Sequence, residues 1–466
     1  MGTNKKKSPI GLQISMQKTL SPSHPRFAWC LLLLVVFYAV SGTTGVFAVP
    51  SYARQTGMPC SACHTVFPQL TAFGREFKLN GYTFTGSTTI EATNEKEHNM
   101  LKLLTNSPLS AMFQTSVTNT AKSIPGTQNT NVEFPQQLSL FYSGLITNHL
   151  GTFIQLTYSG QGGTIGMDNT DIRYSNTTTI ATKRLIYGFT LNNNPSVQDV
   201  WNSIPAWRFP YATSGVAPTP TASTLIEGAL AQQVVGLGAY GYFNSLVYLE
   251  GSIYRSAQQG VAAPPGPAST GIIQGVAPYW RVALQHKWDK HYLEIGTTGM
   301  ITRLHPTGVS GHTDDYTDIG LDGQYELTFP IGSFVIHPSY YWENQKLTAT
   351  FDSSGSMNAT NHLNSFKISG ELFFNKGVGL SLGYFALKGS HDSGLYKPES
   401  VTGSQTGSPD SDGFIAEVDY LPWYNIRLSL QYVYYNRFNG AGTDYDGSGR
   451  NAGNNNTLYL LAWFNF

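Results

Sequence analysis

The chain has 466 residues, of which 12% are charged, and it contains 48 Gly, 27 Tyr and 25 Phe. A soluble domain is about a quarter charged, so this composition disfavours an ordinary soluble protein. Past the N-terminal region, no run of about 18 apolar residues offers a spanning helix. Few charges, many aromatic residues and no helical span together predict a membrane β-barrel, in which apolar residues alternate with polar ones.

The first 48 residues are predicted to be an export signal. The positive n-region contains Lys5, Lys6, Lys7, Lys18 and Arg26. An apolar core from Phe27 to Val40 follows, and Val46-Phe47-Ala48 has the small-residue pattern of a cleavage site. A retained anchor helix is the alternative, but the core is short and no stop-transfer pattern follows it.

Removal of residues 1–48 leaves 23 basic and 28 acidic residues, a formal charge of −5. This charge disfavours nucleic acid as a partner, because phosphate binding needs a basic surface. Removal also takes away Cys30, so Cys60 and Cys63 are the only cysteines of the predicted mature chain.

Those two cysteines belong to Cys60-Ser61-Ala62-Cys63-His64, which has the C-x-x-C-H spacing of covalent haem attachment. Two thiols three residues apart can reach two vinyl groups on one porphyrin edge. The next residue then lies under the ring, where its imidazole can ligate iron. The motif therefore predicts one haem c, bound covalently by Cys60 and Cys63, with His64 as the proximal axial ligand.

Three other interpretations of the motif are a small disulfide loop, a thioredoxin-like redox pair and half a zinc site. A redox pair needs a βαβ context, which the sequence does not show. A zinc site needs two more Cys or His residues at suitable spacing.

Residues 49–107 are predicted to form the cytochrome c segment. A helix is expected from Pro68 to Phe77, with Leu70, Phe73 and Phe77 on one face. A second helix is expected from about Thr93 to Leu104. At about 59 residues, the segment is too small to bury a haem alone, so other parts of the chain must supply walls.

Residues 108–466 show a period of two, as in Tyr424–Tyr435, where Ile426 and Leu428 alternate with Arg427 and Ser429. Sixteen such runs lie near 109–118, 134–146, 149–159, 169–178, 182–191, 231–241, 244–256, 278–288, 290–302, 316–328, 332–346, 363–374, 378–388, 412–421, 424–437 and 457–466. The last run ends in an aromatic residue, Phe466, like the C-terminal signal of bacterial outer-membrane barrels.

The connections between these runs alternate between short and long. Leu421-Pro422-Trp423 and the residues around Asp289 are short, whereas 192–230, 257–277, 389–411 and 438–456 are long. Short periplasmic turns and long outer loops are typical of outer-membrane proteins. The predicted fold is therefore all-β: an antiparallel outer-membrane barrel of about 16 strands, with a small helical cytochrome segment in a lumen wide enough for a channel.

The candidates for the sixth iron ligand are His98, Met100 and Met112. In the first strand, the residues expected to face lipid are Leu109, Ala111, Phe113 and Val117. The residues expected to face the lumen are Ser110, Met112, Gln114 and Ser116. Met112 thus points toward the expected haem. A thioether ligand raises the potential relative to a second His, but Met also commonly fills gaps in cores, and an open sixth site is the further alternative.

Two stretches carry a family resemblance. These are Val49–His64, which reads VPSYARQTGMPCSACH, and Phe67–Tyr82, which includes FPQL and FGREFKLNGY. They resemble the N-terminus of the fused outer-membrane cytochrome–porins, monohaem c-type proteins of Fe(II)-oxidising bacteria. The segment Asn194–Asn202, NPSVQDVWN, is also similar to such porins.

The resemblance implies oxidation of extracellular Fe(II) at the outer membrane of a Gram-negative bacterium. Electrons would pass to a periplasmic c-type cytochrome or copper protein, in the manner of an iron:cytochrome c oxidoreductase. It assigns the thioether bonds to Cys60 and Cys63 and the proximal ligand to His64. The alternatives are a haem conduit for other extracellular donors or acceptors, and a passive solute porin with a structural Cys pair.

Overall fold

The computed structural model describes residues 50–84, 86–93, 99–257 and 264–466. The predicted export signal, residues 1–48, lies outside the described residues. The helices are α2 (Pro50–Thr56), α3 (Cys60–Cys63), α4 (Ala72–Leu79) and α5 (Thr348–Asp352), with 3₁₀ turns η1 (Pro205–Trp207), η2 (Leu225–Glu227) and η3 (Ala452–Asn455). None of the described helices has the length and apolar character needed to span a membrane.

Nineteen strands are described. Their bounds are β1 (Thr89–Thr93), β2 (Asn99–Leu104), β3 (Leu109–Thr120), β4 (Asn131–Thr147), β5 (Leu150–Ser159), β6 (Thr164–Ile180), β7 (Lys183–Asn192), β8 (Val234–Phe243), β9 (Val247–Ser256), β10 (Thr270–Ile273), β11 (Ala277–Trp288), β12 (His291–Thr307), β13 (Asp314–Phe329), β14 (Gly332–Lys346), β15 (Thr360–Phe374), β16 (Val378–Gly389), β17 (Ser411–Trp423), β18 (Ile426–Arg437) and β19 (Thr457–Asn465).

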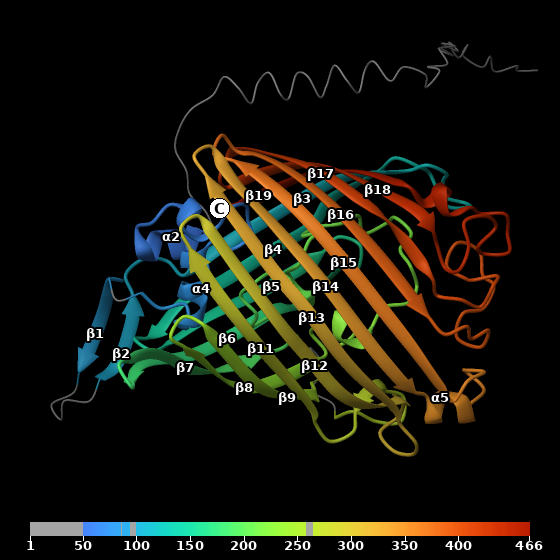
Figure 1. Ribbon diagram of the computed structural model, residues 1–466, viewed down its shortest axis with the longest axis horizontal. Coiled ribbons are helices and arrows are strands. Elements are labelled where there is room, and N and C mark those ends of the chain that lie inside the picture. The colour runs from blue at the N-terminus through green and yellow to red at the C-terminus, as the bar shows by residue number, and fades with distance from the viewer. Residues whose placement is uncertain (1–49, 85, 94–98, 258–263) are drawn as a thin grey trace, which may run out of the picture. The chain divides into compact units, whose positions relative to one another are not determined.

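Sixteen of these strands form a closed antiparallel barrel (Figure 1). The strands β3–β9 and β11–β19 pair in chain order, and β19 pairs with β3 to close the ring. The short β10 pairs with the end of β12, where Thr270 opposes Thr307. The predicted sixteen-strand barrel is confirmed, and each predicted run agrees with its strand to within about five residues.

Connections at the barrel end that holds the C-terminus are turns of two or three residues, and the longer loops lie at the other end (Figure 1). One predicted turn, Leu421-Pro422-Trp423, is wrong. Strand β17 continues to Trp423, and the turn is Tyr424-Asn425. The proline sits in an irregularity between Tyr420 and Trp423, where the pairing register shifts, because it has no N–H for the ladder.

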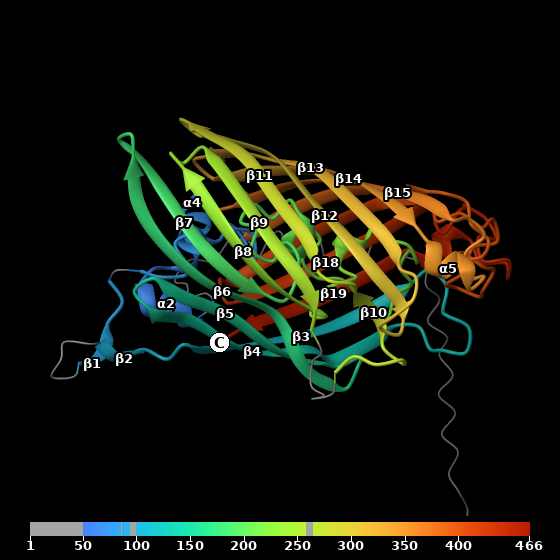
Figure 2. The same cartoon turned by 90° about the horizontal axis from the view of Figure 1, so that it is seen from below.

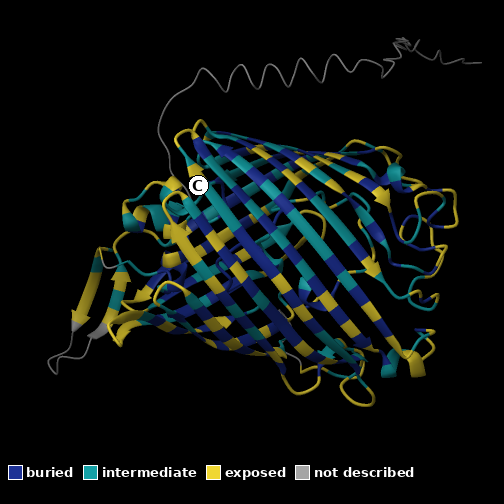
Figure 3. Cartoon of the chain, in the orientation of Figure 1, coloured by how far each residue is buried: buried dark blue, intermediate teal, exposed yellow. Residues whose placement is uncertain are grey.

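Along the barrel strands, buried residues alternate with intermediate or exposed ones (Figure 3). Ser110, Met112, Gln114 and Ser116 of β3 are buried and Leu109 is exposed, as predicted. Outward Leu140, Leu237 and Ile295 are each more than half exposed. An even-numbered closed barrel with an apolar exterior and a polar lumen is the architecture of bacterial outer-membrane proteins, so this is an outer-membrane barrel.

The connection between β7 and β8, residues 193–233, folds into the lumen of the barrel (Figure 2). Its Val197, Trp201 and Ile204 are at most 1% exposed. Asp199 of this segment contacts Arg281 of β11 at 3.3 Å, and Arg281 also pairs with Glu294 at 3.0 Å. We call residues 193–233 the lumen loop. Its position corrects the expectation that all the long connections lie outside the barrel.

Two local predictions in the N-terminal segment need correction. The helix expected at Pro68 begins at Ala72, because the Thr71 side chain caps it by accepting a hydrogen bond from the Gly74 N–H at 3.2 Å. Phe77 is buried, but Phe73 is 37% exposed. In place of the helix expected from about Thr93 to Leu104, the described residues 89–93 and 99–104 form the two strands of a hairpin, and residues 94–98 lie outside the described residues.

In that hairpin, β1 pairs antiparallel with β2, and Ile90 opposes Leu103. The β-branched Thr89, Ile90 and Thr93 favour strand. The period-two pattern of Leu101 and Leu103 around Lys102 therefore overrides the helical spacing that predicted the helix.

Candidate functional site: a cavity between the N-terminal segment and the barrel

The C-x-x-C-H motif forms one helical turn. The His64 N–H donates to the Cys60 carbonyl at 2.8 Å, and this turn places the two cysteines three residues apart on neighbouring positions of one face. Both thiols are free, and Cys60 is 2% exposed. Cys60, Cys63 and His64 all line the cavity described below.

Helix α4 holds this turn in place. The Thr71 N–H donates to the Cys63 carbonyl at 2.9 Å, and the Thr71 hydroxyl donates to the Ala62 carbonyl at 2.5 Å. A Cβ at Gly74 would overlap the Cys63 carbonyl oxygen. A glycine is therefore required for α4 to pass so close to the motif.

The N-terminal segment, residues 50–82, is fastened inside the barrel mouth by strands from several sides. The Tyr82 hydroxyl donates to Asp171 of β6 at 2.7 Å. The Tyr240 hydroxyl of β8 donates to the Leu79 carbonyl at 2.7 Å, and Arg427 of β18 donates to the Phe67 carbonyl at 2.7 Å. Residues 50–82 therefore lie in the barrel mouth at the short-turn end, whereas β1 and β2, which belong to the same predicted segment, lie beyond that end (Figure 1).

A cavity of about 520 Å³ lies between this segment, the β3–β5 wall, β19 and the lumen loop. Ligand sites typically enclose about 300–1,000 Å³. Large apolar and aromatic side chains line much of it: Tyr52, Phe67, Phe77, Tyr82, Phe141, Phe153, Trp207, Tyr211 and Trp463. The barrel and the lumen loop thus supply the walls that the small segment lacks.

Four residues singled out from the sequence meet at this cavity: Cys60, Cys63, His64 and Met112. Met112 is 4% exposed, and its sulfur accepts a weak hydrogen bond from the Gln114 amide at 3.8 Å. His98 lies outside the described residues, and so does the side chain of Met100. Met112 is therefore the candidate sixth ligand that the structure places beside the motif.

Burial sets the protonation states of the motif. It raises the pKa of Cys60 to about 12 and that of Cys63 to about 11. Reactive redox cysteines have lowered pKa values, so these thiols do not resemble a thioredoxin-like pair. Burial lowers the pKa of His64 to about 4, against the opposing effect of the Gln69 and Pro68 backbone, and the imidazole is neutral at pH 7.

Sequence reasoning missed a buried cation in the cavity wall, Lys78 of α4. It is 6% exposed, donates to the Val197 carbonyl at 2.6 Å and lies 5.1 Å from the centre of the Trp207 ring. Within the described part of the chain, no carboxylate lies at ion-pair distance from it, and burial lowers its pKa to about 7. No sequence pattern marks this role, because the burial comes from distant segments.

No cluster of three or more His, Cys, Asp or Glu residues suited to a metal ion occurs among the described residues. A zinc site at the motif, one of the alternatives left open above, thus lacks its further ligands in that part of the chain.

No family model and no curated protein matches the chain. Among solved structures, it is similar to a loop L8 deletion mutant of OmpT, an outer membrane protein of Vibrio cholerae, with 10% identity, a TM-score of 0.42 and coverage of 77% of this chain and 98% of that one. It is also similar to the outer membrane channel DcaP of Acinetobacter baumannii, with 10% identity, a TM-score of 0.43 and coverage of 77% of this chain and 96% of that one. Its similarity to Salmonella typhi OmpF has 14% identity, a TM-score of 0.45 and coverage of 77% of this chain and 97% of that one.

Proposed function

We propose that this outer-membrane barrel is a cytochrome–porin that binds one haem c in the cavity beside the C-x-x-C-H motif. One observation carries the proposal: two thiols, one imidazole and one buried thioether line a single cavity of about 520 Å³. A disulfide or a structural Cys pair needs no such cavity. The resemblance of residues 49–82 to the cytochrome–porins supports the same assignment.

The residues present fit this cofactor. Cys60 and Cys63 would hold it through thioether bonds, and the neutral imidazole of His64 offers a lone pair to iron at pH 7. Met112 would be the candidate for a second protein ligand. The buried Lys78 amine suits a haem carboxylate, because an opposite charge beside it would stabilise its protonated form. When bound, the haem supplies a one-electron redox couple.

The protein walls would control that couple. Apolar rings such as Phe77, Phe141 and Trp463 exclude water, and a thioether at Met112 favours a higher potential than a second His does. A donor that gives one electron at a time suits a single haem, and extracellular Fe(II) that enters the lumen is such a donor.

The position of the segment suits electron export to the periplasm. Residues 50–82 lie at the short-turn end of the barrel, which is the periplasmic end in outer-membrane barrels. A periplasmic c-type cytochrome or copper protein would then receive the electron without crossing the membrane's hydrocarbon layer, about 30 Å thick.

The proposal is tested by stopped-flow reduction of the purified, air-oxidised protein with Fe(II), followed at the haem absorption bands. We expect rapid reduction, which is lost in a Cys60→Ser/Cys63→Ser variant. A haem that stays oxidised with Fe(II) but reacts with another donor would leave a conduit for other substrates. A barrel without haem would be a passive porin.

A further inference from the structure

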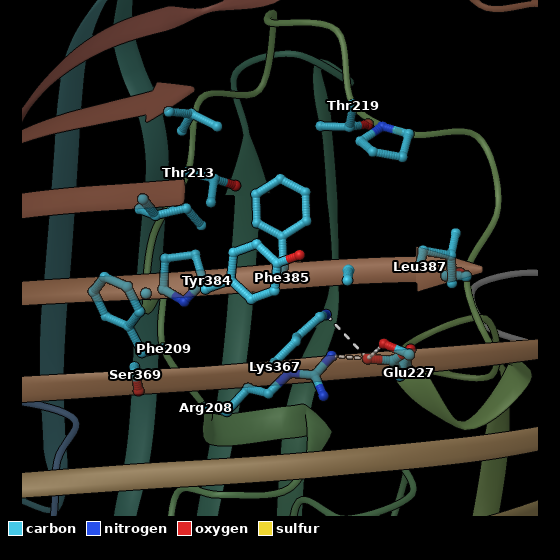
Figure 4. A pocket seen from close by; sticks show the side chains of 18 of the residues that line it. Arg208, Phe209, Thr213, Thr219, Glu227, Lys367, Ser369, Tyr384, Phe385 and Leu387 are labelled. Carbon is cyan, nitrogen blue, oxygen red and sulfur yellow. Dashed lines mark hydrogen bonds and ion pairs between the residues drawn. The ribbon is translucent and has the colours of Figure 1, made fainter. Parts of the chain in front are cut away.

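A second cavity lies deeper in the lumen (Figure 4). It encloses about 290 Å³ between residues 203–223 of the lumen loop and the wall formed by β14–β18. Arg208, Pro210 and Thr213 line both this cavity and the haem-motif cavity, so the two are neighbours across a few residues. Nothing in the proposed redox function uses the second cavity.

Basic groups exceed acidic ones at its base. Lys367 of β15 and Arg208 both contact the same carboxylate oxygen of Glu227, Lys367 at 3.0 Å (Figure 4). Two cations thus share one anion. The side chain of Arg208 is 10% exposed, and its Nη1 atom is buried with no hydrogen-bond partner in the described part of the chain. Lys367 remains 35% exposed toward the cavity.

His337 of β14 also lines the cavity and is 4% exposed. Its Nδ1 atom lies 3.4 Å from Glu371, and its Nε2 atom lies 3.5 Å from the Gln69 amide nitrogen. The partly exposed ammonium of Lys367 and the surplus positive charge favour an anionic group in the cavity, because charge-assisted hydrogen bonds to carboxylates are among the strongest available.

The rest of the cavity is apolar. Phe209 and Phe385 face it, with Pro210, Pro218, Leu387 and Val433 around them (Figure 4 labels Phe209, Phe385 and Leu387). A cavity that is mostly apolar with a few converging polar groups is the usual form of a small-molecule site. The aromatic rings favour a flat apolar body by edge-to-face or stacked contact.

We propose that this cavity is a binding site for a small carboxylate with a flat apolar body. The carboxylate group binds the Lys367 ammonium, beside the Arg208–Glu227 ion pair, and the ring packs against Phe209 and Phe385. No residue of the C-x-x-C-H motif lines this cavity, and Arg208 is shared with the haem-motif cavity.

The test is isothermal titration of the purified full-length mature protein with benzoate, and with benzyl alcohol as the matched uncharged probe. We expect benzoate to bind at least about tenfold more tightly, because the uncharged alcohol cannot form a hydrogen bond between two charged groups with Lys367. Equal binding of both probes, or no binding of benzoate, would overturn the proposal.

Variants locate the site. Lys367→Met should weaken benzoate binding by about tenfold or more, whereas Lys367→Arg, which keeps the charge, should stay within about threefold. The matched control is Lys376→Met, since Lys376 lies exposed in the turn between β15 and β16 and outside the cavity. Folding of each variant is checked by the gel mobility of the unheated barrel. A folded Lys367→Met protein that binds benzoate like the wild type would refute the site. The same titrations on the Cys60→Ser/Cys63→Ser variant test benzoate binding in a barrel that cannot attach haem, so a failure of the haem proposal is distinguished from a failure of this one.

Discussion

Replacing Glu326 with Gln should release the N-terminal segment from the barrel mouth. Arg75 of α4 pairs with Glu326 of β13, and the two side chains are 4% and 17% exposed. Loss of the carboxylate leaves a buried guanidinium unpaired, which costs about 3–5 kcal/mol. Arg75 keeps a hydrogen bond to the Leu70 carbonyl at 2.9 Å and a contact 4.2 Å from the centre of the Tyr292 ring, so we take the lower figure, about 3 kcal/mol.

Because about 1.4 kcal/mol is a tenfold change in an equilibrium constant, the undocked population should rise about 100-fold. Proteinase K cleavage of the folded barrel measures this population when docking and undocking are faster than cleavage. The product is a barrel that has lost its N-terminal segment, and intact-mass measurement over time gives the rate.

The matched control is Glu76→Gln on the same helix. Glu76 pairs with Arg184, and these side chains are 47% and 45% exposed. An exposed pair contributes about 0–1 kcal/mol, so the control should accelerate cleavage less than about fivefold. The reasoning is refuted if Glu326→Gln is cleaved as slowly as the wild type, or if the control is cleaved equally fast.

Three further predictions concern the cavity. Met112→His should lower the haem midpoint potential in spectroelectrochemistry, and an unchanged potential and spectrum would remove Met112 as the axial ligand. Lys78→Met should also lower the potential, because a nearby cation stabilises the reduced form, whereas Lys78→Arg should change it less; equal potentials in all three proteins would contradict this role. Gly74→Ala should reduce the covalent haem per barrel, measured by haem stain, because its Cβ overlaps the Cys63 carbonyl; Gly251→Ala, whose Cβ meets nothing within 4 Å, is the control.

The barrel could be predicted closely because each strand buries one face, and the burial imposes a period of two on every run. The lumen position of Met112 follows from that period alone. The predicted position of the turn after β17 is wrong because Pro422 forms an irregularity inside the strand instead of ending it. A pattern of residue types does not distinguish these two outcomes.

The cavity could be predicted only in part. The motif Cys60–His64 is local and names its own chemistry, whereas the walls depend on long-range packing. The lumen loop folds inward through contacts such as Asp199 with Arg281, which are 82 residues apart in the chain. Lys78 becomes a buried cation, and Trp207 a cavity wall, only because that loop meets the N-terminal segment.

The most direct test of the account is whether the chain carries covalently bound haem. The mature protein is produced in a host that attaches haem c, boiled in detergent, and examined by haem stain and intact mass. We predict a stained band with the mass of one added haem, and an unstained but folded barrel for the Cys60→Ser/Cys63→Ser variant. A wild-type barrel that folds in such a host without covalent haem would contradict the account.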